Sequence, residues 1–141
     1  MEKKQAHKSD SYREAGVDID LAHELLGKVK GRVKAATRPE VEDAPGAFGG
    51  LFRIAAGKYV DPVLVTSIDG VGTKLMIAGE MEKFDTVGFD IVNHCVNDIA
   101  VQGAEPLYFM DYLGIGVLRS ALYEDVLGGI ADACAAQHVA L

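Results

Sequence analysis

The chain runs through the apolar segment Pro62-Val-Leu-Val-Thr-Ser-Ile68 directly into Asp69-Gly-Val-Gly-Thr-Lys74, and this stretch decides the fold. The pattern predicts a strand that ends in a tight turn. The turn brings together a carboxylate, two glycines, a hydroxyl and an ammonium. Carboxylates hold divalent metals, glycines let backbone N–H groups approach phosphate, and a lysine neutralises phosphate charge. The stretch therefore predicts a metal–triphosphate site, with an ordinary Asp-Gly turn that caps a short helix as the alternative.

The composition is that of a single globular domain. The chain has 141 residues, of which 49% are hydrophobic and 25% are charged, enough for one sizeable core. Its net charge of −7 argues against broad binding of nucleic acids. No apolar run reaches the roughly 18 residues of a membrane span, and the polar N-terminus lacks a secretory signal. Because Cys95 and Cys134 are too few for a disulfide framework, we expect buried, reduced thiols in a cytoplasmic protein without a membrane partner.

The hydrophobic periodicity predicts both helices and strands. We expect an α+β domain, with a mixed β-sheet and helices packed on one of its faces. The predicted helices cover residues 18–36, 74–81, 87–103 and 120–137. The predicted strands cover residues 51–56, 62–68 and 107–113. Asp18 or Asp20 is the expected cap of the first helix, and Ser120 that of the last. We expect residues 1–10 to form a flexible polar tail. Because the sequence stops inside an apolar run, we expect residues 11–141 to be one domain of a longer protein.

The predicted helix over 87–103 has an apolar side and a polar side. The polar side carries short side chains and no lysine or arginine: Asp90, Asn93, His94, Asn97 and Asp98. A face turned to bulk water usually carries long charged side chains of both signs. Short oxygen-bearing residues suit a hard cation or a hydrogen-bonded ligand better, although a solvated face remains the alternative. We expect His94 to be a neutral hydrogen-bonding group, because no second His or Cys shares its face.

Three further features are candidates for a phosphate or ligand site. The glycine-rich segment 46–50 either cradles phosphate or is a plain connection. The cations Lys28, Lys30, Arg32 and Lys34 form either a phosphate-facing edge or a solvated helix face. Asp111 lies among aromatic residues, where a lone carboxylate needs a partner or a ligand.

Five motifs occur in the order and at the distances found in one enzyme family. They are Ser11-Tyr-Arg-Glu-Ala-Gly-Val-Asp-Ile-Asp20, Gly46-Ala-Phe-Gly-Gly50, Asp69-Gly-Val-Gly-Thr-Lys74, Cys95-Val-Asn-Asp98 and Gln102-Gly-Ala-Glu-Pro-Leu107. Over residues 11–141 the chain resembles the N-terminal part of the phosphoribosylformylglycinamidine cyclo-ligases, also called aminoimidazole ribonucleotide synthetases. The resemblance implies that residues 11–141 are an N-terminal ATP-binding and dimerisation domain, truncated before a C-terminal domain.

The resemblance implies an ATP-dependent ring closure in de novo purine biosynthesis. In that family ATP phosphorylates the formamide oxygen of formylglycinamidine ribonucleotide, the amidine nitrogen closes the ring, and phosphate leaves to give 5-aminoimidazole ribonucleotide. The implied cofactors are ATP and Mg²⁺, and the implied partners are this small-molecule substrate and a second subunit. The family's homodimer pairs its N-terminal sheets into a barrel-like core.

The resemblance also implies roles for individual residues. Catalytic roles fall on Asp69, Lys74 and Asn97. Nucleotide-binding roles fall on Lys30, Gly46, Phe48, Gly49, Gly50, Asp69, Gly70, Gly72, Thr73, Lys74 and Asp90. The implied metal ligands are Asp69, Asp90 and Asp98.

Two alternatives to the cyclo-ligase remain. One is a non-catalytic nucleotide-binding or dimerisation fragment, and the other is a related ATP-using synthetase or kinase of the same superfamily. Within the superfamily, selenophosphate synthetase is disfavoured because no cysteine precedes Cys95. A P-loop site is disfavoured as well, since no G-x-x-x-x-G-K-[ST] sequence occurs.

Overall fold

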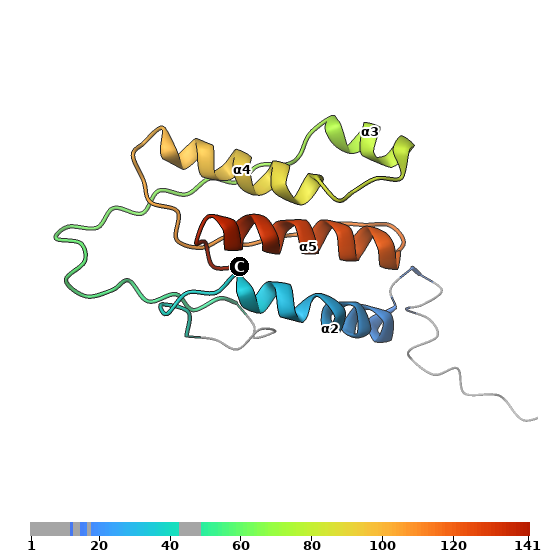
Figure 1. The fold of residues 1–141 in the computed structure, drawn as a ribbon, viewed down its shortest axis with the longest axis horizontal. Coiled ribbons are helices and arrows are strands. Elements are labelled where there is room, and N and C mark those ends of the chain that lie inside the picture. Colours follow the sequence, from blue (N-terminus) through green and yellow to red (C-terminus); the bar gives the residue numbers. More distant parts are fainter. Residues whose placement is uncertain (1–11, 13–14, 17, 43–48) are drawn as a thin grey trace, which may run out of the picture.

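The computed structural model describes residues 12, 15–16, 18–42 and 49–141. The helices in this part of the chain are α2 (Ile19–Ala35), α3 (Lys74–Met81), α4 (Val87–Ala100) and α5 (Ser120–Ala136). Helix α5 lies between α2 and α4 and packs against both, while α3 contacts α4 (Figure 1). The predicted helices are therefore confirmed, with ends that differ by up to three residues. None of the described helices is both long and apolar enough to cross a membrane.

Helix α2 begins where the sequence predicts. The Asp18 side chain accepts a hydrogen bond from the backbone N–H of Leu21 at 3.0 Å, so Asp18 is the cap. Such a bond satisfies one of the N–H groups that the first turn of a helix leaves without a partner. Leu25 and Val29, one turn apart, are buried. They form the stripe through which α2 packs against α5.

Helix α5 is the centre of the described structure, and its small residues let the neighbouring helices come close. A Cβ atom added to Gly88 of α4 would lie 2.3 Å from the backbone nitrogen of Ile130 and 2.6 Å from the carbonyl oxygen of Val126. On the other side, the Arg32 side chain of α2 lies over Gly128. The absence of side chains at Gly128 and Gly129 thus permits close packing around α5. The expected cap is wrong by one residue, because Arg119 has the extended conformation and Ser120 is already helical.

The described residues contain no β-strand, only two isolated bridges. Val41 pairs with Phe52 in the antiparallel sense, and Tyr108 pairs with Ala140 in the parallel sense. The segments predicted as strands at 51–56, 62–68 and 107–113 follow irregular paths around the helices (Figure 1). A strand needs a neighbour for its N–H and C=O groups, and the main chain of 62–68 has no hydrogen bond within the described structure. The predicted mixed sheet is therefore not confirmed by this single chain.

Arg38 ties the end of α2 to two distant segments. Its guanidinium donates to the carbonyl oxygens of Pro106 at 3.3 Å and His138 at 3.0 Å, and it pairs with Glu40 at 3.0 Å. The Arg38 side chain is only 13% exposed. It is therefore a structural cation, and its charge is already balanced.

Candidate functional site

The turn after residue 68 has the geometry expected of a tight Asp-Gly turn. Asp69 Oδ1 accepts a hydrogen bond from the backbone N–H of Gly70 at 2.6 Å. Gly72 has a φ of +76°, in the left-handed region that glycine adopts without strain. Thr73 precedes α3 without a capping hydrogen bond from its side chain, and Lys74 is the first residue of the helix. The turn thus presents Asp69 and Lys74 on either side of two glycines.

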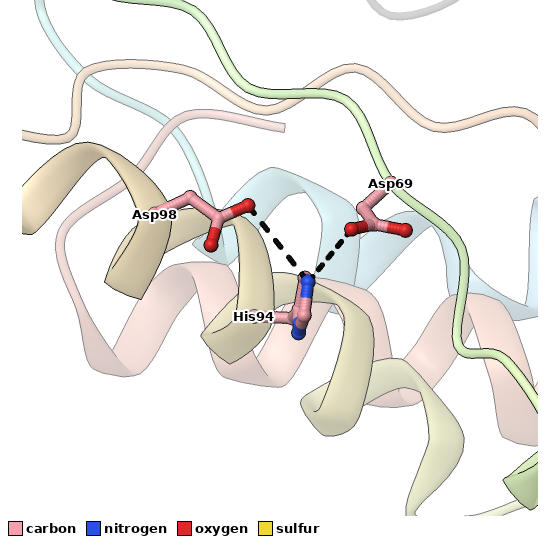
Figure 2. Close-up of side chains that lie close together, drawn as sticks. All are labelled: Asp69, His94 and Asp98. Carbon is pink, nitrogen blue, oxygen red and sulfur yellow. Dashed lines mark hydrogen bonds and ion pairs between the residues drawn. The ribbon is translucent and has the colours of Figure 1, made fainter.

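Helix α4 places its polar face against this turn. His94 Nε2 lies 2.8 Å from Asp69 Oδ2 and 3.8 Å from Asp98 Oδ2 (Figure 2). His94 and Asp98 are one helical turn apart, so both point to the same side of α4. One potential ligand atom from each of the three residues lies within 4.8 Å of the other two, and all three side chains are exposed. We call Asp69, His94 and Asp98 the carboxylate–histidine group.

Hydrogen bonds orient the two carboxylates of this group. The backbone N–H of Gly70, and after it the His94 side chain, hold the pKa of Asp69 below its ordinary value. The Ser67 hydroxyl donates to Asp98 Oδ2 at 2.8 Å. Two ionised carboxylates that face each other without a cation between them repel, so their convergence favours a bound positive ion.

Lys74 and Asp90 form an ion pair beside the carboxylate–histidine group. Lys74 Nζ lies 2.6 Å from Asp90 Oδ1, and their side chains are 61% and 32% exposed. Asp90 is one turn before His94 on α4 but is not part of the carboxylate–histidine group. Its role as a metal ligand stays a prediction. The role of Lys74 in neutralising phosphate charge stays a prediction as well.

No hydrogen bond or ion pair in the described part of the chain links Lys30, Gly49 or Gly50 to this group. Lys30 is exposed on α2, which packs against α5 and makes no contact with α4. Its neighbours Lys28 and Arg32 form ion pairs with Glu124 and Asp132 of α5, so two of the four cations of the expected phosphate-facing edge hold helices together. Gly49 and Gly50 are exposed, while Gly46 and Phe48 lie outside the described residues. Asn97 is exposed on α4, next to Asp98.

Sequence reasoning gave no metal-site role to His94 or Ser67, which both contact the predicted carboxylates. The sequence predicts only a hydrogen-bonding role for His94, because no second His or Cys shares its helix face. The sequence did carry one indication of a metal-site role for His94. His94 and Asp98 are four residues apart, so they lie side by side on a helix face without lysine or arginine. No sequence signal pointed to Ser67, since its contact with Asp98 spans 31 residues.

Asp111 is not part of this group, and although the residue is exposed, the atoms near its carboxyl disfavour the charged form. Desolvation by the atoms around the carboxyl raises the pKa of Asp111. Its charge contributes in turn to the raised pKa values of Tyr123 and Cys134, both on α5. The structure therefore places Asp111 near the central helix, and the carboxyl has no side-chain partner within the described residues.

The sequence comparisons identify the class of protein to which this chain belongs. The family described as "AIR synthase related protein, N-terminal domain" matches residues 52–141, and the chain is a member of it. The chain is 53% identical over 127 residues to the phosphoribosylformylglycinamidine cyclo-ligase of Syntrophotalea carbinolica, covering 90% of this chain and 36% of that protein. The resemblance drawn from the five motifs is thus confirmed, and so is the expected superfamily.

Two further relatives carry the same name. The cyclo-ligase of Desulfitobacterium hafniense is 53% identical over 124 residues, which cover 88% of this chain and 37% of that protein. That of Xanthomonas oryzae pv. oryzae is 50% identical over 131 residues, which cover 93% of this chain and 38% of that protein. The chain thus spans a little over a third of the length of these relatives.

Proposed function

We propose that this chain is the nucleotide- and metal-binding part of an ATP-dependent cyclo-ligase. The reaction would close formylglycinamidine ribonucleotide to 5-aminoimidazole ribonucleotide in de novo purine biosynthesis. One observation carries the proposal. The glycine turn that begins at Asp69 lies against the acidic face of α4, so that Asp69 and Asp98 converge and Lys74 lies beside them. The names of the three relatives support the reaction.

The two carboxylates of the site suit magnesium. Asp69 and Asp98 supply ionised carboxylate oxygens, the ligands that Mg²⁺ prefers, and the open surface leaves room for water and phosphate oxygens. When bound, the cation would neutralise the charge of a triphosphate. Lys74 would add a second positive charge from the other side of the two glycines, while Asn97 would offer an amide for hydrogen bonds.

In this proposal the protein acts mainly by positioning and charge neutralisation. The γ-phosphoryl group of ATP moves to the formamide oxygen of the substrate, which turns a poor leaving group into phosphate. The amidine nitrogen then attacks the activated carbon, and the C–O bond breaks as phosphate departs. Gly70 and Gly72 let the main chain approach the phosphates, and Thr73 adds a hydroxyl at the same turn.

The chain is proposed to work as a homodimer in the cytoplasm. Apolar side chains on the segment before Asp69 are strongly exposed, with Val63 at 82% and Ile68 at 97%. A second copy that covers them would also supply the missing neighbours for the predicted strands. Both cysteines are free thiols, in keeping with a reducing compartment.

Calorimetric titration of the chain with ATP, with and without Mg²⁺, tests the proposal. We expect binding that depends on Mg²⁺ and is lost in Asp69→Asn, because an amide cannot replace the ionised ligand while the turn keeps its shape. Asp61→Asn, which removes an exposed carboxylate outside the group, should bind like the parent chain.

Three results would contradict the assignment. If Asp69→Asn binds Mg²⁺ and ATP with the affinity of the parent chain, the site does not lie at this turn. A folded chain that binds ATP but does not form product, even with the remaining part of a relative added, would favour a non-catalytic nucleotide-binding module. A different product formed from ATP would favour another synthetase or kinase of the superfamily.

A further inference from the structure

We infer that His94 is a ligand of the cation held by Asp69 and Asp98, so that the site prefers a transition-metal dication such as Mn²⁺ to Mg²⁺. The inference deepens the proposed function and relies on it for the two carboxylates. What it adds is a nitrogen donor and the selectivity that this donor gives.

The distances among the three side chains fit one shared cation. Two ligands of an octahedral ion at about 2.1 Å lie about 3.0 Å apart when adjacent and about 4.2 Å apart when opposite. His94 Nε2 lies 2.8 Å from Asp69 Oδ2 and 3.8 Å from Asp98 Oδ2. Small rotations of these exposed side chains would bring all three atoms to one metal.

The orientation of the His94 imidazole favours a role as a metal ligand over a role that only holds Asp69 in place. Nε2 points between the two carboxylates, where a cation would sit, and not toward the rear of Asp69 (Figure 2). In the structure a proton on Nε2 can bridge to Asp69. A metal bound by Nε2 takes the place of that proton while both carboxylates keep their charge. The other carboxylate oxygen of Asp69, Oδ1, accepts a hydrogen bond from the backbone N–H of Gly70. This bond would hold Asp69 in place while its Oδ2 binds the metal.

A mixed set of two carboxylates and one imidazole has a clear preference among dications. Oxygen ligands alone suit Mg²⁺, Ca²⁺ and Mn²⁺, whereas imidazole favours first-row transition ions. Mg²⁺ also gives up its water reluctantly, which weakens its binding to a site on the open surface without nucleotide. We therefore expect Mn²⁺ to bind the chain in the absence of ATP and Mg²⁺ to compete poorly.

Electron paramagnetic resonance of MnCl₂ mixed with the 141-residue chain, without nucleotide, tests this inference. The loss of the free-ion signal gives affinity, competition with MgCl₂ gives selectivity, and spin-echo modulation shows whether a nitrogen nucleus is bound to the ion. We expect nitrogen coupling in the parent chain. His94→Gln should lose this coupling and weaken Mn²⁺ binding by about tenfold or more, with a much smaller effect on Mg²⁺. His23→Gln, at an exposed histidine of α2, is the matched control and should change neither.

Each outcome decides between the inference and the proposed function. Binding of Mn²⁺ without nitrogen coupling, or with equal affinity in His94→Gln, overturns the ligand role of His94. The proposed function survives that result if Mg²⁺-dependent ATP binding persists. Absence of metal binding without nucleotide also overturns the inference. Nitrogen-coupled Mn²⁺ in a chain that does not bind ATP would uphold the inference and contradict the proposed function.

Discussion

At the scale of single residues, the two cysteines show how packing sets chemistry. Cys134 is completely buried in α5, and burial raises the pKa of its thiol to about 12. Cys95 lies on α4 and is only partly buried. The sequence predicted that both would be buried, since each falls on an apolar helix face. It could not rank them, because the ranking depends on which neighbouring helix covers each sulfur.

Thiol reactivity should therefore separate the two cysteines. Because the thiolate is the nucleophile, Cys134 should react with a disulfide reagent at about one part in ten thousand of the rate of a fully ionised thiol at pH 8. We expect one fast thiol in the native chain and two after denaturation. Cys95→Ala should abolish the fast reaction, whereas Cys134→Ala should leave it unchanged. A fast reaction that remains in Cys95→Ala would contradict the packing of α5.

Asp111 predicts a dependence of stability on pH. Its pKa is raised in the folded state, chiefly by desolvation. The folded chain therefore favours the protonated form, and this stabilisation is present below the unfolded pKa of about 4 and is lost as pH rises through the folded value. Asp111→Asn, which cannot ionise, should thus gain stability over the parent chain between acidic and neutral pH.

Urea denaturation of both chains over this pH range measures the effect. Asp61→Asn, at an exposed carboxylate, is the control for the loss of one negative charge. A stability difference between Asp111→Asn and the parent that stays constant or shrinks with rising pH would show that Asp111 is not desolvated.

At the scale of elements, the helices could be predicted and the partners of the other segments could not. Apolar spacing and the Asp18 cap are local, so α2, α3, α4 and α5 follow from the sequence. The polar face of α4 could also be predicted from the sequence, and it supplies His94 and Asp98 to the carboxylate–histidine group. The third, Asp69, comes from a segment 25 residues away from His94. Its position depends on tertiary packing, which periodicity does not describe.

The contact of α4 with α5 depends on the absence of a side chain at Gly88. An added methyl group would meet the backbone of residues 126–130, which cannot move aside as a flexible side chain can. We expect Gly88→Ala to lower the free energy of unfolding by about 1–3 kcal/mol. Gly27→Ala, in an open position on α2, should be neutral or stabilising by about 0.5–1 kcal/mol. Equal effects of the two substitutions in urea denaturation would rule out the close crossing.

At the scale of the whole molecule, the described chain leaves many apolar side chains in water. Val60, Val63 and Ile68 are more than four-fifths exposed, and Tyr112 is 95% exposed. These residues belong to or adjoin the predicted strands, for which the single chain gives too few partners. A sheet completed by two chains would explain why the alternating pattern is present although no ladder forms within one copy.

This explanation predicts the state of assembly. In sedimentation experiments the chain should have twice its mass of 15.0 kDa. Val63→Asp should weaken the dimer by tenfold or more, about 1.4 kcal/mol, because it would bury an unpaired charge. Val117→Asp, at an exposed valine in the loop before α5, is the control and should remain dimeric. A parent chain that is monomeric at high concentration would contradict the prediction.

The main chain before Asp69 has a further consequence, for isotope exchange. The backbone N–H groups of residues 59–69 have no hydrogen-bond acceptor within the described structure. In a lone copy they should take up deuterium almost as fast as a free peptide, whereas the amides of α5 at the centre should exchange slowly. If a second copy pairs with this segment, its uptake will fall as protein concentration rises while that of α5 stays constant. The rate of deuterium uptake by these amides would then measure the association and dissociation of the subunits.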